Sequence, residues 1–157
     1  MINIRPANTD DAVAMAYIMR SLSHFYLDEG VSEIPQWLIE GSSVSEFEQR
    51  LNNDEFKSYV FITPGQALQS GEIEGFISIR LLPERIHLQS LFVSESKQRR
   101  HVASSLWQYV LQEHPAEHYT VRSSIYAVPV YRRFGFVEQG DIQTNEGIRY
   151  QSLSLYR

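Results

Sequence analysis

A basic segment in the middle of the chain has the residue types and the spacing of an anion-binding turn. Residues 97–104 are Lys-Gln-Arg-Arg-His-Val-Ala-Ser. They join an apolar run at 86–93 to a run with helical periodicity at 102–111. A turn from strand to helix presents the free N–H groups of the helix, and the positive end of its dipole, to a ligand. The sequence therefore predicts an anion site here, and a diphosphate is the usual occupant of such a site.

The overall composition limits what else the protein can be. With 157 residues, the chain is long enough for one domain with a proper core, and we expect a single domain over 1–157. The net charge of −5 argues against a nucleic-acid partner and favours cationic ones such as amines. We find no apolar run long enough for a membrane helix and no signal peptide, so we expect a cytoplasmic protein with no membrane partner. The absence of cysteine excludes disulfides, thiolate metal ligands and cysteine nucleophiles.

The hydrophobic periodicity predicts the elements that must position this turn. Strands are expected at 2–5, 59–62, 75–81, 86–93 and 119–123, with two more strands flanking a turn at 144–147. Helices are expected from Thr9 to about Tyr26, at 46–52 after a Ser45 cap, at 97–112 and at 129–134. Residues 28–41 are expected to form a loop or a short helical turn. This order predicts an α+β protein with a mostly antiparallel sheet that helical crossovers interrupt.

Three segments follow a known family pattern in order and spacing over nearly the whole chain. Residues 4–7 and 10–12 could open the fold as a strand and helix. Residues 87–93 are followed at 98–103 by a loop close to Gln/Arg-x-x-Gly-x-Gly/Ala. Residues 124–136 contain Tyr131, Gly135 and Phe136 in the pattern Tyr-x-x-x-Gly-Phe. Together these segments resemble the GCN5-related N-acetyltransferase (GNAT) superfamily. The resemblance implies a three-layer fold with a central mixed sheet of about seven strands flanked by about four helices.

One position departs from the family's loop pattern. His101 stands where the family has glycine, whereas Ala103 keeps the second small residue. We expect His101 to adopt ordinary helical backbone angles with its side chain turned away. The alternative is that the imidazole fills part of the space for the diphosphate, which glycine would leave free.

The resemblance implies an N-acetyltransferase that uses acetyl-CoA as co-substrate, with direct attack by the primary amine of a small molecule or peptide. By resemblance, Tyr131 is the general acid beside the sulfur. His87 falls where some members carry a glutamate base, and an imidazole with a pKa of about 6.5 could accept a proton directly or through water. Gln89 lies two residues further along the strand, so we expect it on the same face as His87, where it could bind substrate. Because of His101, a non-catalytic acyl-CoA-binding module of the same fold remains the alternative.

The same resemblance assigns the cofactor residues. Main-chain groups of the strand would pair with pantetheine, an N–H of Leu91 or Phe92 would polarise the acetyl carbonyl, and Ser124 would hydrogen-bond the pantetheine arm. The full expected set is Leu91, Phe92, Val93, Gln98, Arg99, Arg100, His101, Val102, Ala103, Ser104 and Ser124.

The acceptor site is expected between the first helices and the last hairpin, with Phe25, Tyr26 and Glu29 as an aromatic and acidic lining for a protonated amine. The remaining histidines lack metal-ligand spacing, so we expect no metal. A homodimer through the last strands is an open alternative, because the same apolar residues could equally complete the sheet of one copy: Tyr150, Leu153, Leu155 and Tyr156.

Overall fold

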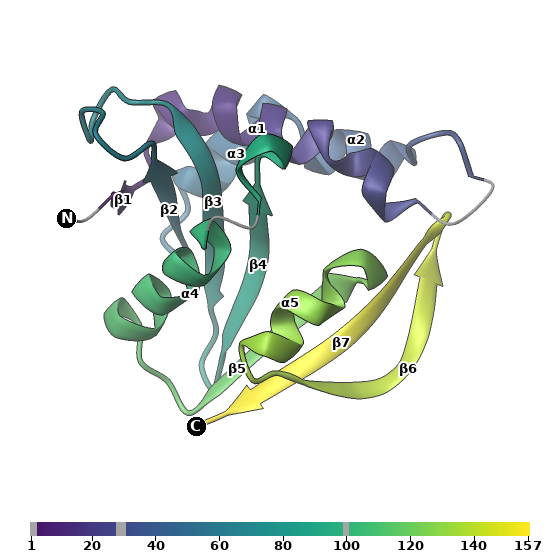
Figure 1. The fold of residues 1–157 in the computed structure, drawn as a ribbon. Coiled ribbons are helices and arrows are strands. Elements are labelled where there is room, and N and C mark those ends of the chain that lie inside the picture. The colour runs from purple at the N-terminus through teal and green to yellow at the C-terminus, as the bar shows by residue number, and fades with distance from the viewer. Residues whose placement is uncertain (1–2, 28–30, 99–100) are drawn as a thin grey trace.

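The computed structural model describes residues 3–27, 31–98 and 101–157, and a seven-stranded sheet forms its centre (Figure 1). The strands are β1 (Ile4–Pro6), β2 (Phe56–Ile62), β3 (Ile73–Leu81), β4 (Ile86–Val93), β5 (His118–Ser124), β6 (Val137–Asn145) and β7 (Ile148–Tyr156). They lie in the order β1-β2-β3-β4-β5-β7-β6, and β4–β5 is the one parallel pair. The predicted α+β fold with a mixed, mostly antiparallel sheet is confirmed.

Helices cover both faces of this sheet and complete three layers. The α-helices of the described residues are α1 (Ala12–Ser21), α2 (Gln36–Gly41), α3 (Val44–Leu51), α4 (Val102–Glu113) and α5 (Val128–Arg133). Short 3-10 turns occupy Thr9–Asp11 (η1), Ser23–Tyr26 (η2), Glu95–Lys97 (η3) and Ile125–Ala127 (η4). Helix α2 begins directly after Pro35, within the segment for which a loop or a short helical turn was predicted.

Side chains that alternate along the strands build a separate core on each face. In β3, Ile77 and Ile79 belong to the core of Trp107 from α4 and Tyr131 from α5. Phe76, directly before Ile77, faces the opposite core, which α1 and α3 cover. The sheet is thus buried on both faces where the helices lie.

The first helical turns begin differently from the prediction. Asn8 caps the first turn, rather than Thr9: its side-chain oxygen accepts from the Asp10 N–H at 2.9 Å, and the Asp11 carboxylate accepts from the Asn8 N–H at 2.8 Å. Asp11 also forms a buried two-point ion pair with Arg5, with N–O distances of 2.8 and 2.9 Å. This pair ties the first strand to the first helix. The long helix predicted up to about Tyr26 ends at Ser21 and continues as η2.

Two further helix starts correct the prediction. Ser43, not Ser45, caps α3, because its hydroxyl accepts from the Glu46 N–H at 3.1 Å. Helix α4 begins at Val102, not at Lys97. Residues 95–97 form only a 3-10 turn, and Gln98 then returns to extended angles with φ −66° and ψ 154°.

The sheet forks between β4 and β5. The two strands pair only at Ile86–Tyr119, His87–Thr120 and Leu88–Val121, after which β5 pairs with β7 alone. Figure 1 shows the resulting halves, β1–β4 and β5–β7–β6, diverging from each other. Just past the last pair, Gln89 is an extra residue in β4, since Ile79 faces Leu88 and Ser78 faces Ser90. Such a bulge bends the strand and changes which side chains point to each face.

Within the described residues, we find no helix that has both the length and the apolar character to cross a membrane.

Candidate active site

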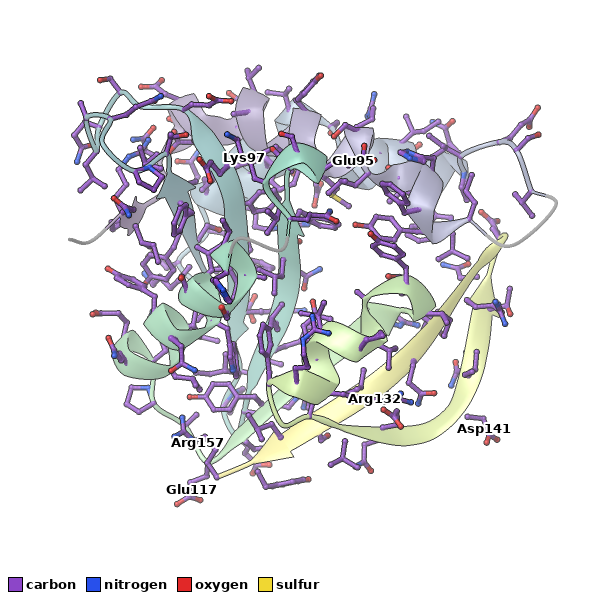
Figure 2. The ribbon with its side chains drawn as sticks, viewed as in Figure 1. Glu95, Lys97, Glu117, Arg132, Asp141 and Arg157 are labelled. Atoms are coloured by element: carbon purple, nitrogen blue, oxygen red, sulfur yellow. The ribbon has the colours of Figure 1, made fainter. Side chains whose placement is uncertain are left out.

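The basic turn predicted from the sequence lies at the rim of this fork. Figure 2 shows Glu95 and Lys97 at the end of β4, close to the start of α4. The Lys97 ammonium lies 3.8 Å from the buried carboxylate of Glu74, so its charge is balanced inside the protein. Arg99 and Arg100 lie outside the described residues.

The first turn of α4 has N–H groups without a partner inside the helix. The N–H groups of Val102, Ala103 and Ser104 have no partner within the helix, because the first intrahelical bond joins the Ser105 N–H to the His101 carbonyl at 3.0 Å. Among the described residues, no side chain caps this helix start. Val102 is buried in the core, which fixes the helix on the sheet, whereas Ser104 is half-buried at the surface. The predicted anion site therefore has the local geometry that anion binding needs.

His101 contradicts the expectation of ordinary helical angles. Its φ is +65° and its ψ is +16°, which is the left-handed region where the family's glycine would be unstrained. The chain keeps the glycine-type backbone and places an exposed imidazole on it. A left-handed conformation costs a residue with a Cβ roughly 1–2 kcal/mol.

This strain gives a stability prediction. The variant His101→Gly should raise the free energy of unfolding by up to about 1 kcal/mol, because glycine adopts this backbone without steric cost but has more freedom in the unfolded chain. Urea denaturation monitored by circular dichroism measures the change. The control is His118→Gly, a substitution within β5, which should destabilise the protein. A clear loss of stability in His101→Gly would contradict the left-handed assignment.

The register of β4 decides which main-chain groups point into the fork. The Ser94 N–H donates to the Glu74 carbonyl at 2.9 Å, so these two opposite residues are hydrogen-bonded to each other. Hydrogen-bonded and non-hydrogen-bonded pairs alternate along an antiparallel ladder, so the next pair, Val93–Gly75, is a non-hydrogen-bonded one. The main-chain N–H and C=O groups of successive residues point to opposite edges of a strand. Those of Leu91 and Val93 therefore point away from β3 and toward the fork, whereas those of Phe92 point toward β3. Consistently, the Phe92 carbonyl oxygen lies only 2.9 Å from where a Cβ on Gly75 would be. Of the two N–H groups expected to polarise the acetyl carbonyl, the register favours that of Leu91.

Gln98 holds the turn onto the end of β4. Its side-chain amide donates to the Val93 carbonyl at 3.1 Å, and its side-chain oxygen accepts from the Tyr126 hydroxyl at 3.3 Å. Ser124 ends β5, and its hydroxyl accepts from the Ala127 N–H at 3.3 Å, capping η4. That hydroxyl keeps its own proton to donate to a ligand.

Tyr131 is buried on α5 against the fork. Its ring meets Phe134 and Phe136 edge-on, with centroid distances of 6.1 and 5.8 Å. Only 5% of the residue is exposed, and burial raises the pKa of Tyr131 above the ordinary value for tyrosine. Among the described residues, no hydrogen bond joins its hydroxyl to a side chain or backbone group. Because no buried side-chain oxygen of these residues lacks a partner, the hydroxyl oxygen is itself partly accessible. The side chain is therefore a protonated phenol whose proton is available to a ligand.

An aromatic cluster joins the N-terminal segment to the fork. The rings of Phe25 and Tyr126 stack at 5.0 Å, and Tyr26 lies 5.8 Å from Phe92 and 6.1 Å from Tyr126. Burial, followed by the nearby phenols of Tyr131 and Tyr126, raises the pKa of Tyr26. The structure thus places Tyr26, one of the predicted acceptor residues, near Tyr131, and it places Phe25 against Tyr126. Glu29 lies outside the described residues.

His87 lies on the opposite face of the sheet from Tyr131. Its neighbours Ile86 and Leu88 face the core that contains Tyr131, so the intervening His87 faces the α1 and α3 side. Its Nδ1 lies 2.9 Å from the Thr120 hydroxyl oxygen. Burial lowers the pKa of His87, and the charges of Arg85, Arg80 and Arg122 lower it further. The imidazole is therefore neutral near pH 7 and able to accept a proton.

Gln89 does not simply share the face of His87, as strand alternation had predicted. It is the bulged residue, so the two-residue period is interrupted at this position. Its side chain is exposed. Sequence reasoning also missed Tyr126, although it lies within the family-like segment 124–136, and it missed the arginines around His87. In the described part of the chain, no three His, Cys, Asp or Glu side chains are grouped as metal ligands.

Comparisons with known proteins agree with this geometry. The family model described as an acetyltransferase (GNAT) domain matches residues 26–156. The search of curated proteins found no match. A GCN5-related N-acetyltransferase from Rhodopseudomonas palustris has a similar structure, with a TM-score of 0.74, 20% identity, and coverage of 98% of this chain and 94% of the other.

Two further solved structures show the same likeness. The PaiA N-acetyltransferase of Thermoplasma acidophilum, in complex with coenzyme A, gives a TM-score of 0.72 at 13% identity over 97% of this chain and 98% of the other. The ribosomal-protein-S18-alanine N-acetyltransferase of Escherichia coli gives 0.70 at 15% identity over 99% and 94%. At these identities the structures show a shared fold, and the family model covers most of the chain. The chain belongs to the GNAT acetyltransferase family.

Proposed function

We propose that this protein transfers an acetyl group from acetyl-CoA to a primary amine. The observation that carries the proposal is the fork between β4 and β5, which has an uncapped helix N-terminus at its rim and a buried tyrosine beside it. A solved relative of the same fold is in complex with coenzyme A. Acetyl-CoA supplies the activated thioester, and the residues of the fork bind and polarise it.

Main-chain groups and one hydroxyl around the fork match the diphosphate and the pantetheine arm of acetyl-CoA. The free N–H groups of Val102, Ala103 and Ser104 would donate to the diphosphate, and the exposed His101 keeps the left-handed backbone that glycine would adopt at its position. The fork-facing groups of Leu91 and Val93 would pair with the amides of pantetheine as an added strand. The hydroxyl of Ser124 would donate to the same arm.

The acid and the base flank the fork from opposite faces. The amine nitrogen attacks the thioester carbon while the Leu91 N–H donates to the developing oxyanion. As the C–S bond breaks, Tyr131 gives its proton to the departing sulfur. The proton lost from the amine passes to His87, directly or through water. With these roles, the amine would approach from the α1 and α3 side and the thioester from the α4 and α5 side, and the two substrates would meet in the fork.

The experiment that tests the proposal combines calorimetry with a thiol-release assay. We expect acetyl-CoA to bind and free thiol to accumulate only when a suitable amine from a panel of small amines and peptides is present. Binding without thiol release for every amine would instead support the acyl-CoA-binding module, the alternative favoured by His101.

The neutral state of His87 predicts a pH dependence. Since burial and nearby arginines hold the pKa of His87 below 6.5, turnover of a weakly basic amine should stay high at pH 6.5 and fall only as the pH drops through that lower value. In His87→Gln, the fall in turnover at low pH (the acidic limb of the pH–rate profile) should disappear, and kcat should fall about tenfold or more. The control is His118→Gln, which removes the imidazole at the first residue of β5, where the ring stacks on Tyr156. An unchanged acidic limb in His87→Gln would exclude His87 as the base.

A further inference from the structure

Three arginines surround His87 on one face of the sheet. In the strand register, His87 lies opposite Arg80 of β3 and Thr120 of β5, and residues directly opposite share a face. Arg122 follows Thr120 by two residues and so shares this face as well. Arg85 reaches the same place from the β3–β4 turn, since its Nε donates to the Thr120 hydroxyl at 3.2 Å. That hydroxyl is also the partner of His87.

Among the residues that the structure describes, carboxylates balance only part of this positive charge. All three arginines are exposed. Among the described residues, Arg80 is the one with an ion pair, to Glu55 at 3.3 Å, and such an exposed pair contributes little. Arg122 instead lies over the Tyr150 ring at 4.0 Å and donates to its hydroxyl at 2.5 Å. In a chain of net charge −5, three guanidinium groups that share one carboxylate partner among the described residues favour the binding of an anion.

The arginines border the place where the two substrates would meet. The last pair between β4 and β5 is Leu88–Val121, so His87 precedes the fork by one residue on β4 and Arg122 follows it by one residue on β5. They also share the face from which the amine would approach. An amine that reaches His87 would therefore bring the rest of its molecule among these guanidinium groups.

We infer that the acceptor amine also carries a carboxylate or a phosphate, which Arg80, Arg85 and Arg122 bind beside His87. Guanidinium groups match both anions in charge and in hydrogen-bond geometry. This inference rests on the proposed acetyl transfer and specifies its acceptor. The effect of the three arginines on the pKa of His87 agrees with their closeness to it.

The test compares acceptors that differ only in the anionic group. One pair is an amino acid and its amide, and the other is phosphoethanolamine and ethanolamine, so that the two pairs distinguish carboxylate from phosphate. The wild-type protein should prefer the anionic member of at least one pair by about tenfold or more in kcat/KM. Arg122→Gln and Arg80→Gln should each reduce this preference several-fold, through a lower kcat/KM for the anionic member, and Arg122→Lys should keep part of it. The control Lys57→Gln removes one positive charge from the opposite face of β2 and should leave the preference unchanged.

The outcomes separate this inference from the proposed function. Equal turnover of both members of each pair, or a preference that the arginine variants retain, would overturn the inference and leave acetyl transfer standing. If no amine is acetylated, the proposed function fails, and NMR titration of His87 then decides about the anion site. Adding phosphate or a free amino acid should raise the pKa of His87 in the wild-type protein and much less in Arg122→Gln. No change in the wild-type protein would contradict an anion site.

Discussion

Replacing Tyr131 with phenylalanine is expected to lower kcat by about a hundredfold or more while the Kd for acetyl-CoA changes less than about twofold. Burial of the side chain raises the pKa of Tyr131, and no hydrogen bond from its hydroxyl is found among the described residues. Without that hydroxyl, the departing thiolate would leave unprotonated from a buried site, where a negative charge is poorly solvated. Single-turnover kinetics and calorimetry measure the two quantities separately.

The matched control for this variant is Tyr119→Phe. Tyr119 is equally buried in the same core, and its hydroxyl donates to the His114 carbonyl at 2.7 Å, on the far side from the fork. That variant should lose stability, by about 1 kcal/mol for one hydrogen bond, and keep its kcat. If Tyr131→Phe behaves like Tyr119→Phe, Tyr131 is a core residue with no part in the chemistry.

A negative charge at the start of α4 should weaken acetyl-CoA binding without harming the fold. In Ser104→Glu, the carboxylate occupies the first helical turn, where it interacts favourably with the helix dipole, so stability should stay the same or rise. The same carboxylate would repel the diphosphate, and we expect the Kd for acetyl-CoA to rise about tenfold or more, equivalent to about 1.4 kcal/mol. Calorimetry at low ionic strength measures the loss, and added salt should reduce it by screening.

The control for Ser104→Glu is Gln108→Glu, which adds the same charge one turn further along α4, where the side chain is exposed. Its Kd should stay within about twofold of the wild-type value, because the free N–H groups lie only in the first turn. An unchanged Kd in Ser104→Glu would place the diphosphate elsewhere.

The sequence predicted the sheet well because hydrophobic alternation and turn residues determine it locally. The strand at 86–93 matches β4, and the final hairpin turns at Glu146 and Gly147, where positive φ angles suit a tight turn. The strands β2 and β3 begin earlier than predicted, at Phe56 and Ile73, because pairing with each other extends them beyond their apolar centres.

Features that depend on three-dimensional geometry were missed or mistaken. The cap at Asn8 depends on where the buried Arg5–Asp11 pair holds the chain, and spacing alone does not show this. A strict two-residue period assigns alternate side chains to the same face of the strand, and the bulge at Gln89 interrupts that alternation. The arginines near His87 come from separate segments of the sequence, and only the register of the strands brings them together.

The most direct measurement follows the acetyl carbonyl itself. Acetyl-CoA labelled at the carbonyl carbon is mixed with the protein and an anionic amine, and NMR distinguishes the thioester, the amide and free acetate. The account predicts that the thioester signal converts to an amide signal in the presence of both protein and amine. A thioester signal that persists with every amine, or that converts only to acetate, would contradict acetyl transfer by this fork.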